Sequence, residues 1–334
     1  MAITIKDVAK QAGVSISTVS RVVNDSKPVS PELKKKVMDV IEELGYRPNE
    51  VARSLVTKKS YLIGVIVPDI GQSHVANMLR GIEEVGKMYN YDILLCSSYG
   101  DKNAELNYLQ LLNRKQVEGL IIMSAKLEKD VETYINAFNI PFVFLSTNDY
   151  REEYRSVDID NEIAVYEMVN YLLHLNHEEI AYIGTKPGKK TKAQVKRDAF
   201  VKAMKDSGLA SDLVVETESM SKDAGYDAAK ELMNGKGNPT AVFCASDELA
   251  IGVMNYCHDH GIRVPEDLSV TGMGDIEMAS YIRPRLTTIS IPYYDIGAVS
   301  IRRIVKVLKD EEQTEAEIKL PFQIHKRESC KKRA

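Results

Sequence analysis

The chain has 334 residues, 44% of them hydrophobic and 28% charged, which is enough for two or three globular domains whose core needs no metal or disulfide. The formal net charge is −4, but it is unevenly distributed. Residues 1–60 carry eleven Lys and Arg against seven Asp and Glu, whereas residues 61–334 carry 33 against 41. A small basic head on a larger acidic body predicts a polyanionic partner for the head alone.

The sequence shows no sign of export, membrane insertion or cysteine chemistry. Its start is polar from Lys6 onward, and no stretch has the length of a signal-peptide core or a membrane span, so we expect a cytoplasmic protein. None of the four cysteines has CxxC spacing, which favours reduced thiols over zinc or redox chemistry. These residues are Cys96, Cys244, Cys257 and Cys330. We expect no cofactor and no bound metal.

The start of the chain has the pattern of two short helices joined by a glycine turn. Thr4 and Asp7 are spaced as a capping box that opens the first helix, and Gly13 ends it. Ser15 can cap a second helix over about 16–23. Such a pair is typical of a helix-turn-helix, whose second helix lies in the major groove of DNA. An ordinary capped surface helix is the alternative that this stretch alone leaves open.

The outward face of the second helix is rich in short hydroxyl side chains. The helical period leaves Ser17, Ser20 and Arg21 on or near the outside, together with Ile16. Short side chains let a helix axis come close to DNA, hydroxyl groups can donate to phosphates or base edges, and arginine can bridge a guanine or a phosphate. This composition favours a recognition helix.

A third helix and a linker follow. Residues 30–32 supply a serine cap, a proline at the first helical position and an acidic first turn, and the apolar stripe behind them ends at Gly45. We expect this helix to close a small core over the first two. Residues 46–60 indicate a linker in which Asn49 can cap a short helix, with a plain tether as the alternative.

From residue 61 the sequence alternates apolar strands with amphipathic helices, which predicts doubly wound lobes with parallel sheets. The expected strands lie at 61–69, 91–98, 117–124 and 140–146, and then at 180–184, 213–217, 241–246 and 268–273. The expected helices lie near 75–89, 103–116, 128–138, 193–207, 223–234 and 247–260. A segment at 286–290 and a helix near 295–309 are expected to lead back to the first lobe.

The motifs DVAKQAGVSISTVSRVVN (7–24) and GYRPNEVARSL (45–55) resemble the head of the LacI/GalR repressor family, and the resemblance extends over the whole chain. It implies a homodimer on a pseudo-palindromic double-stranded operator and a hinge helix at 49–56 that folds on DNA. It also implies that Leu55 enters the central base step from the minor groove. The predicted DNA-binding residues are Thr4, Ser15, Ile16, Ser17, Thr18, Arg21, Asn24, Tyr46, Asn49, Ala52, Arg53 and Leu55.

The same resemblance implies the domain organisation. We expect a helix-turn-helix domain at 1–48, a hinge helix and linker at 49–60, and a body at 61–334 similar to a periplasmic binding protein. The expected lobes cover about 61–160 with 291–322, and about 161–290 with 323–334. The body is expected to carry the dimer surface and an inter-lobe cleft for an effector or corepressor.

Sugar-binding members of this family carry an arginine and an aspartate that hydrogen-bond the ligand in the cleft. The matching positions hold Lys196, with Arg197 next to it, and Gly274, with Asp275 next to it. Arginine and lysine are not equivalent at a bidentate site, and loss of a polar anchor weakens sugar binding. Asp247 fits the family as a cleft residue, but we interpret it as a helix N-cap.

The catabolite control protein A group of this family departs from the sugar pattern in a similar way. The stretches RGIEEVGKMYNYDILL (80–95), KQVEG (115–119) and YDIGAVSIRR (294–303) resemble that group. Its corepressor is the phosphocarrier HPr phosphorylated on a serine, and the resemblance implies that Arg302 pairs with the phosphoserine. The helical period by itself favours an ordinary amphipathic helix. The predicted corepressor contacts are Tyr89, Tyr294, Asp295, Arg302 and Arg303.

The sequence thus predicts a homodimeric, allosteric transcription regulator, with global carbon catabolite control by serine-phosphorylated HPr as its function. The alternative is a local sugar-operon repressor that responds to a small sugar or sugar phosphate in the cleft. A solute-binding protein of a transporter is disfavoured by the basic head and the missing signal peptide. An enzyme is disfavoured because there is no Gly-rich phosphate loop, nucleophile elbow or metal-spaced histidine pair. We interpret His258 and His260 as surface residues.

Overall fold

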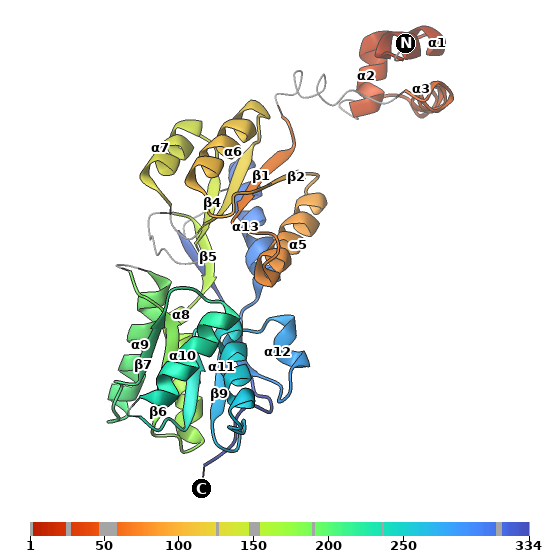
Figure 1. The fold of residues 1–334 in the computed structure, drawn as a ribbon. Coiled ribbons are helices and arrows are strands. Elements are labelled where there is room, and N and C mark those ends of the chain that lie inside the picture. Colours follow the sequence, from red (N-terminus) through yellow and green to blue (C-terminus); the bar gives the residue numbers. More distant parts are fainter. Residues whose placement is uncertain are drawn as a thin grey trace. The chain divides into compact units, whose positions relative to one another are not determined.

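The computed structural model describes residues 3–24, 28–46, 59–124, 127–146, 154–188, 191–235, 237–311 and 316–333. The chain divides into two compact units, a head at 1–60 and a body at 61–334 (Figure 1). Among the residues that the structure describes, no helix is long and apolar enough to cross a membrane.

The head is a small bundle of three helices. They are α1 (Ile5–Ala12), α2 (Ile16–Asn24) and α3 (Pro31–Leu44). The fully buried core residues are Val8, Ala12, Val19 and Val37. Because the core takes one apolar face from each helix, the opposite face of α2 is left to solvent.

Both helix starts that the sequence predicts for α1 and α2 are confirmed. The Asp7 carboxylate accepts hydrogen bonds from the amide and the hydroxyl of Thr4 at 2.9 and 2.7 Å. The Ser15 hydroxyl accepts one from the amide of Thr18 at 3.1 Å. Gly13 joins the two helices at φ 65°, in the left-handed region that glycine adopts without strain. These contacts fix the short turn of the helix-turn-helix.

The first lobe of the body is a parallel sheet in the order β2-β1-β3-β4. Its strands are β1 (Leu62–Val67), β2 (Asp92–Ser97), β3 (Gly119–Ser124) and β4 (Phe142–Ser146), and its helices are α5 (Ser73–Met88), α6 (Lys102–Arg114), α7 (Lys129–Phe138) and α13 (Tyr293–Leu308). Helices α5 and α13 lie side by side (Figure 1). A Cβ atom on Gly81 would lie 2.0 Å from the carbonyl oxygen of Tyr294, and one on Gly297 would lie 2.0 Å from that of Met78. Only glycine at these positions permits such close contact between the helices.

The second lobe contains a six-stranded sheet in the order β12-β10-β9-β8-β6-β7, in which β12 alone is antiparallel to its neighbour. Its strands are β6 (Ile180–Thr185), β7 (Val214–Thr217), β8 (Ala241–Cys244), β9 (Ser269–Gly274), β10 (Thr287–Ser290) and β12 (Gln323–His325). Its helices are α8 (Asn161–His174), α9 (Lys192–Asp206), α10 (Lys222–Asn234), α11 (Asp247–Asp259) and α12 (Glu277–Tyr281). Buried side chains fill both faces of this sheet.

Three segments of the chain connect the two lobes. Strand β5 (Ser156–Ile159) leads from the first lobe into α8, and β11 (Glu317–Leu320) leads from α13 to β12. The two strands pair in parallel with each other. Residues 291–292 form the third connection, between β10 and α13.

The predicted combination of an α-helical head with an α/β body is confirmed, with some corrections in detail. The sequence did not predict β5, β11, β12, α8 or α12. The segment 286–290 lies in the second lobe, where β10 pairs with β9, so only α13 returns to the first lobe. The missed strands have three or four residues, too few for a period to show, and α8 has apolar residues on most of its circumference.

The point where the body begins is held by one carboxylate. Glu118 accepts a hydrogen bond from the amide of Tyr61 at 2.7 Å and one from the hydroxyl of Tyr91 at 3.1 Å. The rings of the two tyrosines contact each other with their centroids 5.8 Å apart. The first residue of the body is thereby fixed to the amino-terminal ends of the first-lobe strands β1, β2 and β3.

Candidate nucleic-acid interface, docking face and cleft

The outer face of α2 carries the predicted base-reading residues. Ile16, Ser17 and Arg21 are exposed, and 45% of the surface of Ile16 is accessible although the residue is apolar. The hydroxyl of Ser15 lies 2.8 Å from the hydroxyls of both Ser17 and Thr18. This arrangement places an apolar contact, a group of hydroxyls and a guanidinium on one short helix, which is the set that base edges and phosphates require.

The hinge positions are not part of this described surface. Asn49, Ala52, Arg53 and Leu55, and the side chain of Asn24, lie outside the described residues. Their DNA contacts stay predictions. Thr4 is exposed at the start of α1 and Tyr46 is half-buried after α3, where it packs on the core of the head.

The predicted corepressor contacts define a candidate docking face, which is the outer side of α13 together with the neighbouring part of α5. The hydroxyl of Tyr294 donates to the Glu84 carboxylate at 2.6 Å, and the guanidinium of Arg80 lies 5.4 Å from the centre of its ring. The bond to Glu84 raises the pKa of Tyr294. Asp295 and Arg302 are both exposed on α13. Two contacts from α5 thus hold the Tyr294 ring on this face.

The predicted residue Tyr89 lies at the end of α5, where the ammonium group of Lys309 sits 4.8 Å from its ring centre. This cation–π contact joins the end of α5 to the end of α13. The structure therefore brings Tyr89, Tyr294, Asp295 and Arg302 to the same pair of packed helices.

Arg303 is a correction to the predicted docking set. Only 3% of its surface is exposed, and its Nη1 donates to the carbonyl oxygens of Ser156 at 2.8 Å and Ala316 at 3.0 Å. One residue turns a helix by about 100°, so Arg302 and Arg303 cannot both face the same partner. Arg303 points into the protein and does not belong to the exposed face.

The predicted cleft residues Lys196 and Arg197 diverge on α9. Lys196 is buried, its Nζ donates to the carbonyl oxygen of Ala245 at 3.2 Å, and burial with the nearby Lys192 lowers its pKa to about 8. Arg197 instead forms ion pairs with Asp198 and Glu216. Of the two residues, only Lys196 lies in the interior of the protein.

Asp247 is not the N-cap that the sequence predicts, because Ser246 caps α11 through the amide of Leu249. Asp247 occupies the first helical position and is fully buried. Its carboxylate accepts hydrogen bonds from the hydroxyl of Thr288 and from the amide of Ile276. Burial raises its pKa to about 7. Asp247 thus joins the start of α11 to β10 and to the residue that precedes α12.

Asp275 is likewise used inside the protein. One carboxylate oxygen accepts a hydrogen bond from Arg327 and the other lies 2.8 Å from Nδ1 of His325. Its backbone has φ 55°, and Gly274 before it has φ 137°. Asp275 therefore binds the C-terminal segment of the chain to the loop after β9.

The sequence missed a group of residues where the lobes face each other. His74 lies in the first turn of α5, and its ring lies 5.4 Å from that of Tyr293 on α13. Burial, with Lys192 and Lys196 nearby, lowers the pKa of His74 to about 4. Lys192 pairs with Asp158 of β5 at 2.5 Å. No motif joins these residues in the sequence, since they come from four separate elements, α5, α13, α9 and β5.

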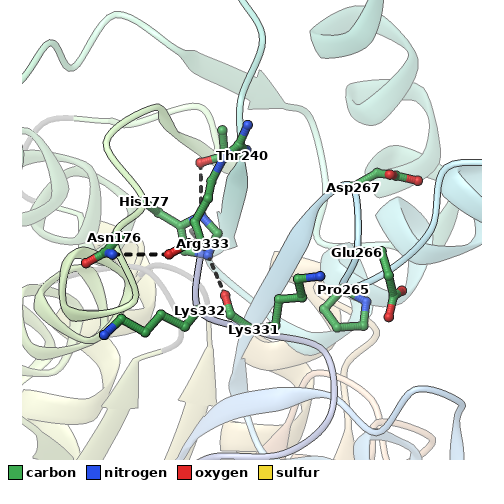
Figure 2. Close-up of a pocket in the computed structure, with 9 residues that line it drawn as sticks. All are labelled: Asn176, His177, Thr240, Pro265, Glu266, Asp267, Lys331, Lys332 and Arg333. Atoms are coloured by element: carbon green, nitrogen blue, oxygen red, sulfur yellow. Dashed lines mark hydrogen bonds between the residues drawn. The ribbon is translucent and has the colours of Figure 1, made fainter.

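A separate open cavity of about 780 Å³ lies in the second lobe (Figure 2). His177 is buried there, with one ring nitrogen 2.9 Å from the hydroxyl of Thr240 and the other 3.1 Å from the carbonyl oxygen of Lys331. Asn176 donates to the carbonyl oxygen of Arg333, so the cavity borders the bound C-terminal segment. It contains none of the residues predicted for DNA, corepressor or cleft.

The comparisons with known proteins cover both units. Residues 4–49 match the model of the lacI family of bacterial regulatory proteins, and residues 169–330 match that of a periplasmic binding protein-like domain. The chain is 39% identical to the HTH-type transcriptional regulator RegA of Clostridium saccharobutylicum, over 98% of this chain and 99% of that protein. It is 36% identical to catabolite control protein A of Priestia megaterium, over 99% and 100%.

The fold has a close structural counterpart. The crystal structure of a lac repressor dimer bound to operator and an anti-inducer superposes with a TM-score of 0.87 and 27% identity, over 98% of this chain and 99% of that one. A helix-turn-helix head on a periplasmic-binding-protein-like body defines a DNA-binding transcriptional regulator and not an enzyme. The chain belongs to the lacI family of bacterial regulatory proteins.

Proposed function

We propose that this regulator is a cytoplasmic homodimer that binds a pseudo-palindromic operator and exerts global carbon catabolite control. Its corepressor is a serine-phosphorylated, HPr-type phosphocarrier that docks on α13 and α5. The observation that carries the proposal is the exposed guanidinium of Arg302 on the same helix pair as Tyr294. The full-length similarity to catabolite control protein A, at 36%, supports the same assignment.

The chemistry of the docking face fits a phosphoprotein. A guanidinium can form two parallel hydrogen bonds to a phosphate and is always charged, so Arg302 is a strong anchor for phosphoserine. Asp295, about two turns earlier on the same helix, can pair with a cation of the partner. Tyr294 is held in place by Glu84 and Arg80, so less conformational entropy is lost when a partner packs on its ring.

The cleft favours this function over induction by a neutral sugar. Its predicted polar anchors already have partners in the protein: Lys196 binds the Ala245 carbonyl, and Asp275 binds Arg327. A sugar would have to break such contacts to form its own. Small sugar phosphates stay secondary effectors in this proposal, since Lys192 and Lys196 supply positive charge near His74.

The proposed mechanism is a coupling between two sites through a two-state body. The heads of the dimer read the two half-sites through Ile16, Ser17 and Arg21, and paired Leu55 side chains kink the central step. Docking of the phosphoprotein on α13 favours the arrangement of the lobes that is competent for DNA. Linkage then requires DNA to raise the affinity for the phosphoprotein by the same factor.

The test is fluorescence anisotropy of a labelled catabolite-type palindrome with increasing regulator, in the presence of serine-phosphorylated HPr, unphosphorylated HPr or neither. We expect only the phosphorylated form to tighten DNA binding, by about five- to 150-fold, the range of ordinary allosteric coupling. Arg302→Ala should abolish the gain and leave basal DNA binding unchanged. If a free sugar or sugar phosphate changes DNA affinity and the phosphoprotein does not, the protein is a local sugar-operon repressor.

A further inference from the structure

The two strands that connect the lobes begin at the same place on α13. Ser156 is the first residue of β5, and Ala316 directly precedes β11. The amide of Ser156 donates to the carbonyl oxygen of Ala316 at 3.0 Å, which starts the pairing of the two strands. The third connection, residues 291–292, leads directly into the first turn of α13. All three connectors between the lobes therefore meet this helix.

Arg303 forms the contact between α13 and both strands. Its Nη1 donates to the carbonyl oxygens of Ser156 at 2.8 Å and Ala316 at 3.0 Å. The side chain is 3% exposed, so these hydrogen bonds are made away from water, where a charged donor contributes more than a neutral one. The adjacent residue, Arg302, points outward on the proposed docking face.

The helix itself is rigidly placed. Its contact with α5 passes through Gly81 and Gly297, where backbone atoms of the opposite helix leave no space for any side chain. Such a helix pair can shift as a body but cannot easily deform. A displacement of α13 is therefore passed on to whatever its buried side chains hold.

We infer that Arg303 is a positioning residue that couples the outer face of α13 to the connectors between the lobes. A partner bound through Arg302 acts on α13, and Arg303 transmits the resulting displacement to the starts of β5 and β11. Binding and transmission thus lie on two adjacent arginines, one exposed on the outer face and the other buried. The part of this inference that concerns docking rests on the proposed function. The contact of Arg303 with the two connector strands does not depend on it.

The experiment compares Arg303→Met and Arg303→Lys with Arg302→Met as the matched control, all in the full-length protein. Methionine keeps an unbranched apolar stem and removes every donor, and lysine keeps the charge but not the fork. Hydrogen exchange is followed by mass spectrometry in peptides that cover 154–160 and 316–321. The affinity for serine-phosphorylated HPr and the gain in operator affinity are measured on the same samples, after circular dichroism has checked the fold.

In Arg303→Met we expect exchange in both connector peptides to rise by at least about tenfold, because each connector loses a buried hydrogen bond from a charged donor. Affinity for the phosphoprotein should stay within about threefold of the wild type, while most of the gain in operator affinity disappears. Arg303→Lys should lie between these values. Arg302→Met should show the reverse, with lost phosphoprotein binding and unchanged exchange.

Two results would overturn the inference. In the first, exchange in 154–160 and 316–321 is the same in both Arg303 variants as in the wild type. In the second, Arg303→Lys loses phosphoprotein binding as fully as Arg302→Met. If Arg303→Met does not fold, Arg303→Lys decides by the same two criteria. If wild-type protein does not respond to the phosphoprotein, the proposed function fails, and the exchange data still decide whether Arg303 ties the connectors to α13.

Discussion

The carboxylate of Asp247 and the hydroxyl of Thr288 form a hydrogen bond in the interior of the second lobe. Asp247 begins α11, and Thr288 lies on β10, the strand from which the chain returns to the first lobe. The backbone of β9 packs directly against this pair, since a Cβ atom on Gly272 would lie 2.2 Å from Oδ1 of Asp247. A buried acid thus sits where the second lobe leads into a connector.

Asp247→Asn is expected to destabilise the protein more at low pH than at high pH. The pKa of Asp247 is about 7 in the folded protein against an ordinary 3.8, so the folded state binds the proton more tightly. The wild type therefore loses stability as the pH rises from 4 to 7, whereas the Asp247→Asn variant does not, because its amide does not titrate. At pH 5 the variant lacks one of the two hydrogen bonds to Thr288 and Ile276, at a cost of about 1–3 kcal/mol.

The measurement for Asp247→Asn is urea unfolding of both proteins at pH 5, 6 and 7. The difference between their free energies of unfolding should shrink by roughly 1.4 kcal/mol per pH unit. A difference that is the same at the three pH values would show that Asp247 is ionised throughout. Thr288→Val serves as the control, because it removes the hydroxyl and keeps the titrating acid.

Lys196→Met is expected to change how stability depends on alkaline pH. The pKa of Lys196 is about 8 against an ordinary 10.5, so between these values the unfolded chain holds more protons than the folded one. The wild type therefore gains stability as the pH rises through this window, and the methionine variant does not gain it. Urea midpoints at pH 7.5 and 9.5 test this. Equal shifts in both proteins would contradict a buried, easily deprotonated lysine.

Tyr294→Phe is expected to weaken the response to the phosphoprotein without affecting basal DNA binding. The hydroxyl bond to Glu84 fixes the ring on the docking face, and a hydrogen bond contributes about 0.5–1.5 kcal/mol. We expect a loss of about two- to tenfold in phosphoprotein affinity, measured by isothermal titration calorimetry. Glu84→Gln keeps an acceptor for the hydroxyl and should lose less. Identical affinities for the wild type and Tyr294→Phe would remove Tyr294 from the docking face.

Leu55→Ala is expected to remove most of the operator specificity. In the proposed complex the Leu55 side chain unstacks a base step, and without it the DNA bend that increases contact would not be stabilised. Binding to random-sequence DNA should persist and should weaken steeply with salt, because phosphate contacts release counterions. Fluorescence anisotropy with operator and random DNA at several salt concentrations measures both the specific and the non-specific affinity. Retained discrimination between the two DNAs would contradict this role of Leu55.

The sequence predicted those features that one helix or strand determines locally. The exposed face of α2 followed from the spacing of Val19 and its apolar neighbours, and the caps at Thr4 and Ser15 followed from residue type. Each of these depends on residues within a few positions of one another. Local periodicity and capping rules are sufficient for such features.

The errors fell on side chains whose partners are distant in the chain. Arg303 faces inward because Ser156 and Ala316 offer carbonyl oxygens there. Asp275 is occupied because Arg327 returns to it with the C-terminal segment. Helical period places a residue on a side of its helix, but it does not reveal which backbone group from another element arrives on that side.

The bond between Glu118 and Tyr61 fixes the point at which the chain enters the body. Fifteen residue steps separate Tyr61 from Tyr46, which is the last described residue after α3. Because Tyr61 is held by contacts within the body, a change in the length of the linker between these two residues should leave this attachment point intact.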